Sequence, residues 1–300
     1  YVKIIGLESV MLEIIKSIIF GIVEGITEWL PISSTGHMIL LDEFIKMDVS
    51  DKFREMYLVV IQLGAIMAVV LLFWWRIWPF CKEENFKKHY VKHKVAGFLD
   101  NFKFIKQDIF IMWFKIVAAC VPAIIVEVAF GDNLEKWFYN YKTVAIMLIL
   151  IGIVFIIVEE KNKKNIPSVN KIGQITYTTA FWIGMFQLVA AVFPGTSRSG
   201  ATIIGGLILG LSRTVAAEFT FYLAIPVMFG ASLIKIIKFG LGFSALEAGI
   251  LLTGMITAFI VSLFVIKFLM GYIKKHDFKV FGWYRIILGV LVLGYFALAG

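Results

Sequence analysis

Long apolar stretches separated by short polar segments make up most of this chain. Six stretches are long enough to cross a hydrocarbon core as helices, which takes about 20 residues each. The pattern therefore predicts an all-α integral membrane protein with six transmembrane helices. These spans are expected at residues 57–75, 109–130, 141–158, 215–237, 246–270 and 281–299.

Two further apolar regions, 12–41 and 173–211, are interrupted midway by proline, glycine and small polar residues. The interrupting segments are PISSTG and PGTSRSG. A helix break at membrane depth frees backbone polar groups, which is tolerated only where they line a cavity or are buried in protein. We therefore predict two re-entrant helix–loop–helix hairpins, with an ordinary proline kink in a full span as the alternative.

Composition supports a membrane protein. Hydrophobic residues make up 60% of the 300-residue chain and the mean hydropathy is +0.88, whereas soluble domains are about 45–50% apolar. The net charge of +8 comes from lysines between apolar segments, as in the cytoplasmic loops of membrane proteins. The charge therefore indicates topology rather than nucleic-acid binding. The two cysteines, Cys81 and Cys120, have neither disulfide-framework nor zinc-site spacing.

Loop charges also give an orientation. If each hairpin returns to the side from which it entered, three segments with excess lysine and arginine share one side, the cytoplasm by the positive-inside rule. These segments are 76–106, 159–172 and 269–282. Loops without such an excess lie on the other side, and both termini are then outside. These loops are 42–56, 132–142 and 239–245.

The two halves of the chain share one outline, an interrupted hairpin followed by three spans. Within a single membrane domain, 1–300, repeat 1 covers about 11–160 and repeat 2 about 173–300. Because each half crosses the membrane an odd number of times, the second half is inverted relative to the first. Inverted repeats place their sites at the repeat interface near the membrane midplane, so we expect the two broken tips to meet there.

The first tip follows two carboxylates. Glu24 and Glu28 are four residues apart, so a helix presents both on one face. Bare carboxylates at low dielectric repel and need a shared proton, a cation or an arginine. Mg²⁺ or Ca²⁺ prefers carboxylate and phosphate oxygens, so we predict that Glu24 and Glu28 bind a divalent cation beside a phosphate. The alternative is that both face a water-filled vestibule.

Hydroxyl groups follow the first break. Ser33, Ser34 and Thr35 stand at a helix start, where free N–H groups suit an anion. His37, three residues after Ser34, is a candidate base for a serine nucleophile or a candidate acid for the leaving group. The alternative is a capping serine with a lone histidine.

The second tip, PGTSRSGATI, predicts an anion-binding loop. Arg198 carries a planar fork that suits bidentate phosphate binding. Gly195 and Gly200 let backbone N–H groups approach an anion. The alternative is an ion pair between Arg198 and Glu24 or Glu28. The added hydroxyl donors are Thr196, Ser197, Ser199 and Thr202.

The motifs EGITEWLPISSTGH and PGTSRSGAT resemble the signatures of the bacterial undecaprenyl-pyrophosphate phosphatases, often called bacitracin-resistance proteins. The resemblance extends to IQLGAIMAVV and to SRTVAAEFTFYLAIPVMFGAS. It implies hydrolysis of the terminal phosphate of undecaprenyl pyrophosphate, with a divalent cation. This reaction recycles the carrier lipid for peptidoglycan synthesis and confers bacitracin resistance. The implied location is the bacterial plasma membrane, with the site facing the outer side.

Residue by residue, the resemblance implies acidic roles for Glu24 and Glu28 and a nucleophile or phosphate contact at Ser34. It also implies a general acid or general base role for His37 and phosphate binding by Arg198. Direct attack by water remains an alternative to a phosphoserine. The supporting contacts to phosphate are expected from Ser33, Thr35, Gly195, Thr196, Ser197, Ser199, Gly200 and Thr202.

Other classes fit less well. Acid-phosphatase-like membrane lipid phosphatases use two histidines in separate motifs, and here His89, His93 and His276 lie in predicted cytoplasmic loops without such a motif. A lipid-phosphate flippase remains the rival, because inverted repeats with broken helices are typical of transporters. Acid, base and hydroxyl groups favour the enzyme.

The partners follow from this reading. A polyprenyl pyrophosphate with its tail in the bilayer requires a lateral apolar cleft, which we predict beside Trp29, Phe193 and Met185. The small residues of GASLIKIIKFGLG allow a homodimer.

Overall fold

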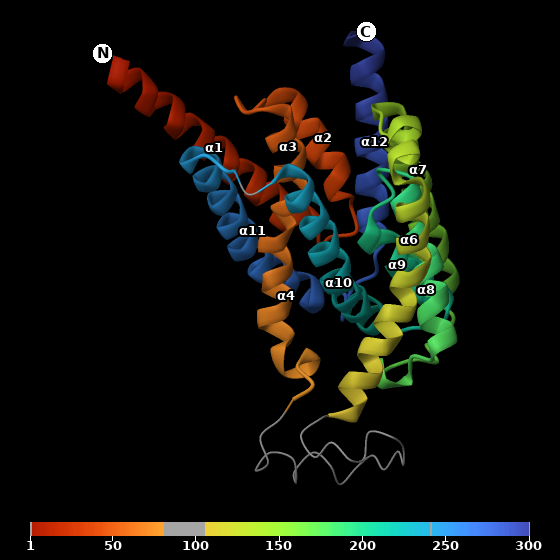
Figure 1. Cartoon of the computed structure of the whole chain (residues 1–300). Helices are drawn as coiled ribbons and strands as arrows, with labels where there is room; N and C mark the ends of the chain where they lie inside the picture. Colours follow the sequence, from red (N-terminus) through yellow and green to blue (C-terminus); the bar gives the residue numbers. More distant parts are fainter. Residues whose placement is uncertain (1, 81–105, 241, 300) are drawn as a thin grey trace.

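The structure is a computed structural model that describes residues 2–80, 106–240 and 242–299 (Figure 1). Its secondary structure is helical, and the described residues contain no strand beyond an isolated bridge between Val169 and Leu211. Cys81, His89 and His93, together with most of the basic loop, lie outside the described residues.

The helices are arranged as follows in chain order. They are α1 (Val2–Thr27), α2 (Ser34–Phe44), α3 (Asp51–Val60), α4 (Gln62–Ile77), α6 (Gln107–Phe138), α7 (Tyr141–Asn162), α8 (Tyr177–Val192), α9 (Arg198–Ile208), α10 (Arg213–Phe239), α11 (Ala245–Tyr272) and α12 (Lys279–Ala299), with a short 3₁₀ turn at Ile172–Gln174.

Six of the described helical segments are long and apolar enough to cross a membrane. The prediction of six spans is therefore confirmed, and the first span joins α3 and α4 across Ile61. Their outer surfaces expose large apolar side chains such as Val128, Phe264 and Trp283, as a multi-pass membrane protein requires. The segments are Asp51–Ile77, Gln107–Gly131, Tyr141–Asn162, Arg213–Phe239, Ala245–Tyr272 and Lys279–Leu298.

Both predicted helix breaks are present. The first separates α1 from α2 at residues 28–33, and the second separates α8 from α9 at residues 193–197. Helices α2 and α9 have 11 residues each, which gives a length of about 16 Å, half of a hydrocarbon core. In Figure 1, α1 descends from the N-terminus to the centre of the molecule and α2 turns back upward.

The helices before the breaks dock on the opposite half of the chain. α1 packs along α11 and α8 packs along α6, while α7 pairs with α12. Both docking contacts are too close for a side chain. A Cβ added at Gly25 would lie 2.9 Å from the carbonyl oxygen of Ala258, and one added at Gly184 would lie 2.2 Å from that of Ala119. Because the broken helix of each half packs on a helix of the other half, both breaks lie at the centre of the molecule.

Candidate active site

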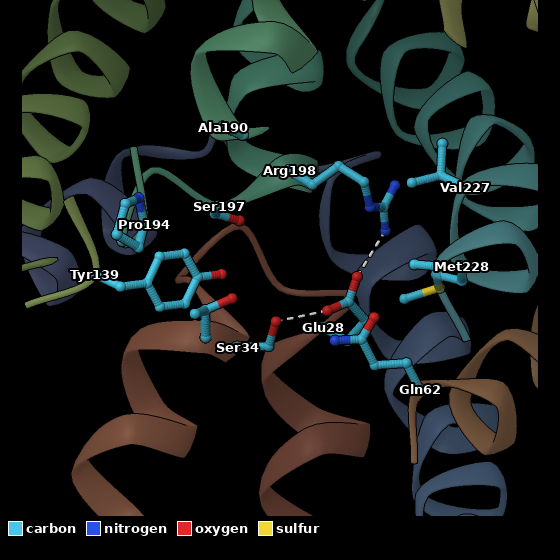
Figure 2. A pocket seen from close by; sticks show the side chains of 13 residues that line it. Glu28, Ser34, Gln62, Tyr139, Ala190, Pro194, Ser197, Arg198, Val227 and Met228 are labelled. Atoms are coloured by element: carbon cyan, nitrogen blue, oxygen red, sulfur yellow. Dashed lines mark hydrogen bonds and ion pairs between the residues drawn. The ribbon is translucent and has the colours of Figure 1, made fainter. Parts of the chain in front are cut away.

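The two breaks meet in space. Arg198, the first residue of α9, donates from Nη2 to Glu28 Oε1 over 2.7 Å. Ser199 Oγ donates to the backbone carbonyl of Glu28 over 3.2 Å. Figure 2 shows Glu28 between Arg198 and Ser34, with dashed lines to both. The expectation that the two tips lie together is confirmed.

The two helices after the breaks begin with the same backbone geometry. Ser33 caps α2 at φ 76° and its Oγ accepts from Gly36 N over 3.2 Å. Ser197 caps α9 at φ 70° and its Oγ accepts from Gly200 N over 3.1 Å. Among the described residues, only these two non-glycine residues have positive φ, a conformation that serine rarely adopts. Each break therefore uses the same turn to start a helix at the centre.

A cavity of about 130 Å³ lies between the tips. One wall is polar, with Glu28, Ser34 and Arg198 (Figure 2), and the other is apolar, with Val227 and Met228 of α10. Its lining therefore suits a molecule with a charged head and an apolar tail. The remaining lining residues are Thr35, Gln62, Tyr139, Ala190, Pro194, Gly195, Ser197 and Ala231.

Glu28 is the central contact of the site. Its carboxylate accepts a hydrogen bond of 2.6 Å from Ser34 Oγ at Oε2 and the bond from Arg198 at Oε1. Arg198 also donates to the carbonyl oxygen of Thr220 over 3.1 Å. Because Glu28 is only 6% exposed, removal of one partner of such a buried ion pair costs about 3–5 kcal/mol. The Arg198–Glu28 ion pair, one of the alternatives from the sequence, is present.

Glu24 stands one helical turn before Glu28, and Glu28 N donates to its carbonyl oxygen. Its side chain is fully buried, and neither carboxylate oxygen has a hydrogen-bond partner among the described residues. An orphaned buried carboxylate needs a proton or a cation. No group of three or more His, Cys, Asp or Glu side chains that could hold a metal ion occurs in the described ranges. Mg²⁺ commonly uses one or two carboxylates plus substrate phosphates, and this donor set fits that mode.

His37 makes two contacts outside the cavity. Its Nδ1 lies 2.7 Å from the carbonyl oxygen of Ser33, and its Nε2 lies 2.7 Å from Tyr284 Oη. Since a carbonyl only accepts, Nδ1 carries the proton and Nε2 accepts from the tyrosine. Neither contact involves Ser34, whose hydroxyl donates to Glu28 instead. An acid/base role for His37 stays a prediction, and the carboxylate is the base within reach of the serine.

Several predicted phosphate contacts stand behind the cavity wall. Thr202 Oγ1 lies 2.8 Å from Thr220 Oγ1 of α10, and Ser199 Oγ lies 3.1 Å from Ser197 Oγ. These hydroxyls hold the second tip to its neighbours. The predicted residues that do not line the cavity are Glu24, Ser33, His37, Thr196, Ser199, Gly200 and Thr202.

The tail path differs from the prediction. Trp29 is fully buried, with its ring 5.3 Å from that of Phe221, and Phe193 packs on Phe138 with ring centroids 4.8 Å apart. Neither these two residues nor Met185 lines the cavity. The expectation that Trp29 lines an open cleft is wrong, because its indole is buried against Phe221 of α10.

Sequence reasoning missed Arg285 of α12. Its guanidinium is fully buried and donates to the carbonyl oxygens of Pro31 at 3.1 Å and of Gly195 and Thr196 at 2.8 Å. The available signal was an arginine inside an apolar span, which by default marks a function. Sequence reasoning also missed two polar residues that line the cavity. Gln62 lies within a predicted span, and Tyr139 lies just before one.

Comparisons with known proteins cover both tips and most of the chain. A family model described as "Bacitracin resistance protein BacA" matches residues 17–291. A protein of Desulfitobacterium hafniense named "Undecaprenyl-diphosphatase" is 61% identical over 96% of this chain and 97% of its own length. "Undecaprenyl-diphosphatase 1" of Clostridium acetobutylicum is 58% identical over 95% of this chain and 98% of its own. An "Undecaprenyl-diphosphatase" of Enterococcus faecalis is 54% identical over 94% and 96%.

Proposed function

The chain belongs to the bacitracin resistance protein BacA family, and from this membership we propose that it is an undecaprenyl-diphosphatase. It is a membrane enzyme that hydrolyses the terminal phosphate of undecaprenyl pyrophosphate and yields undecaprenyl phosphate. This product is the carrier lipid of peptidoglycan synthesis, and its recycling confers resistance to bacitracin. The observation that carries the proposal is the Ser34–Glu28–Arg198 chain of contacts on one cavity wall.

The cavity supports a charged lipid as substrate. The pyrophosphate lies against the polar wall, where α2 and α9 both begin and present free N–H groups with the positive ends of their dipoles. The first isoprene units lie against the apolar wall of α10, at Val227, Met228 and Ala231. The remaining tail extends into the bilayer.

When the substrate binds, Arg198 exchanges its Glu28 partner for the phosphate. Its guanidinium is bound to Glu28, and a phosphate offers the same bidentate acceptor geometry with more negative charge. When the terminal phosphoryl group takes over Arg198, the Glu28 carboxylate loses that ion pair and keeps its bond from Ser34. The carboxylate is then available to accept a proton.

The chemical step follows from the 2.6 Å contact between Ser34 Oγ and Glu28 Oε2. Ser34 Oγ bonds to the terminal phosphorus as its proton passes to Glu28, and the bridging P–O bond breaks so that undecaprenyl phosphate leaves with the electron pair. Water then attacks the phosphoserine, inorganic phosphate leaves and Ser34 regains a proton. Arg198 and the N–H groups stabilise the charge on the transferred group, the largest contribution expected for such a reaction. Direct attack by water activated by Glu28 is the alternative.

A divalent cation, Mg²⁺ or Ca²⁺, is part of the proposal. Glu24 and Glu28 would hold it, and its chemistry is to neutralise the pyrophosphate charge. The support is the fully buried Glu24 carboxylate, whose oxygens have no partner in the described part of the chain.

We also propose that α1–α2 and α8–α9 are re-entrant hairpins of an inverted repeat, 11–160 and 173–300, in the bacterial plasma membrane with the site open to the outer side. Three observations support the repeat: the two identical caps, the short α2 and α9, and the exchanged docking of α1 on α11 and α8 on α6. A homodimer through the face around Gly230, where an added Cβ would meet open space, stays a prediction.

The test is phosphate release from undecaprenyl pyrophosphate by purified protein in detergent, with and without EDTA. Wild type is expected to release phosphate with Mg²⁺, EDTA is expected to abolish release, and Glu28→Gln is expected to lower kcat/KM by roughly 100- to 1,000-fold. Lys163→Gln is the control and should match wild type, because Lys163 does not line the cavity and its ion pair among the described residues is with Glu160. No release by a protein that still binds the lipid would favour a lipid-phosphate flippase, the other function for which broken helices are suited.

A further inference from the structure

Arg285 is a buried cation without a carboxylate. It is fully buried in α12, and among the ion pairs of the described residues none involves it. Charges taken out of water are normally paired because their desolvation is costly. Arg285 instead gives its donors to three backbone carbonyls, one on the first tip and two on the second. A buried arginine that faces only loop backbone indicates a role in shaping the loops.

The contacts fix the orientation of a peptide group. In a trans peptide the C=O and the following N–H point in opposite directions. The carbonyl of Thr196 points to Arg285 Nη2 at 2.8 Å, so the N–H of Ser197 points the opposite way. That N–H has no acceptor among the described residues, and Ser197 lines the cavity. Arg285 thereby turns a free donor away from itself, in a residue that lines the cavity proposed to bind the phosphate.

The first tip is tied to the same guanidinium. Nη1 donates to the carbonyl of Pro31, two residues before the cap Ser33. A Cβ added at Gly200 would lie 3.3 Å from Arg285 Nη1, so the guanidinium sits directly under the first turn of α9. Gly200, predicted from the sequence as a phosphate contact, leaves room for this arginine. The positive charge lies behind both helix starts, where low dielectric makes it effective.

We infer that Arg285 is a positioning residue for phosphoryl transfer, which docks the two tips together and aims the N–H of Ser197 at the transferred phosphate. This inference rests on the proposed function. It differs from a purely structural role in one respect: loss of Arg285 weakens the transition state more than the ground state, since the oriented donors meet the charge that develops on the phosphoryl oxygens.

The experiment compares Arg285→Gln and Arg285→Lys with wild type in three measurements. These are kcat and KM for phosphate release, inhibition by orthovanadate as a mimic of the five-coordinate phosphorus, and the melting temperature. Arg285→Gln is expected to lower kcat by about 100-fold and to weaken vanadate inhibition in parallel, with a small change in KM. Arg285→Lys keeps the charge but loses the fork, so a loss of about tenfold is expected.

Arg213→Lys is the matched control. Arg213 is bound to Glu159 by two nitrogens at the start of α10, and its replacement is expected to lower the melting temperature while kcat and vanadate inhibition stay unchanged. Arg285 variants that are also less stable but keep the wild-type kcat and vanadate affinity would overturn the inference. If Arg285→Gln does not fold, Arg285→Lys alone decides by the same criterion. Wild type without phosphate release would overturn the proposed function itself, and the inference with it.

Discussion

The two tips have the same backbone and opposite chemistry. Each starts a helix with a serine cap at positive φ, and each cap binds the N–H of a glycine three residues on. The first tip supplies a carboxylate and a hydroxyl group, Glu28 and Ser34, whereas the second supplies a cation, Arg198. The comparison teaches that one backbone turn, used twice, brings two helix starts to one cavity. The side chains alone distinguish the two tips, and in the proposed mechanism Arg198 binds the phosphate while Ser34 attacks it.

A second pair of positions makes the same point deeper in the helices. Glu24 and Gln187 each stand seven residues before the proline of their tip. Both are buried, and the terminal side-chain atoms of both lack partners among the described residues. One position holds a carboxylate and the other its neutral amide. The first hairpin is therefore the one suited to a cation.

The largest expected difference between the tips is in their serines. Ser34→Ala should lower kcat by at least roughly 1,000-fold because it removes the attacking oxygen. Ser199→Ala should cost less than about tenfold, because its hydroxyl contacts the Glu28 backbone and the Ser197 hydroxyl but does not line the cavity. Steady-state phosphate release measures both, and rapid-quench trapping identifies the phosphoserine. A near-normal rate for Ser34→Ala without trapped phosphoserine would assign the attack to water.

The next largest effect is expected from the ion pair between Glu28 and Arg198. Glu28→Gln should lower kcat/KM by roughly 100- to 1,000-fold, since it removes the proton acceptor. It also leaves Arg198 buried without its partner, so the melting temperature should fall. Adding Arg198→Met should restore part of that stability but none of the activity, with a coupling of about 1–3 kcal/mol in a double-mutant cycle. Strictly additive losses of stability would show that the two tips do not depend on this pair.

Variants of Glu24 and of Gln187 should differ in how their activity depends on Mg²⁺. Glu24→Gln makes the first hairpin resemble the second, and the Mg²⁺ concentration for half-maximal activity should rise at least about tenfold because a charged ligand is lost. Gln187→Leu, the matched change in the other hairpin, should leave it unchanged. Mg²⁺ titrations of phosphate release and of melting temperature measure this. An equal response of both variants would remove Glu24 from the cation site.

The smallest effects concern the caps. Ser33→Ala and Ser197→Ala should each lower the free energy of unfolding by about 1 kcal/mol, since a helix start loses its side-chain acceptor. Ser33→Gly and Ser197→Gly should cost less, because glycine adopts positive φ without strain. Thermal unfolding in detergent gives the ranking. A different order at the two tips would show that their shared geometry has unequal energetic support.

The helices and breaks could be predicted because hydropathy and proline act locally. The six spans end within a few residues of the predicted bounds, and both breaks fall at the predicted segments. Glu28, Ser34 and Arg198 were predicted as site residues because ionisable and hydroxyl groups stand out in an apolar chain, and they lie together on the cavity wall. Their catalytic roles remain predictions.

The missed features depend on contacts between distant helices. Arg285 serves loops that precede it by 89 to 254 residues, and no local pattern connects them. The pairing of His37 with Tyr284 likewise depends on how α12 lies against α2. Trp29 was expected in an open cleft because the lipid tail must reach the site, but its ring packs against Phe221 of α10 and is fully buried.

Because Arg285 lies in α12, which follows both tips in the sequence, the order of synthesis has a consequence for this enzyme. Both tips and their side chains emerge from the ribosome well before α12. Until that helix inserts, the carbonyl oxygens of Pro31, Gly195 and Thr196 lack their hydrogen bonds from Arg285. A nascent chain can thus contain every group proposed to contact the phosphate before Arg285 joins the two tips. If Arg285 has the proposed role, the site is complete only once α12 has inserted, and hydrolysis of the lipid is expected to begin only after α12 has been translated.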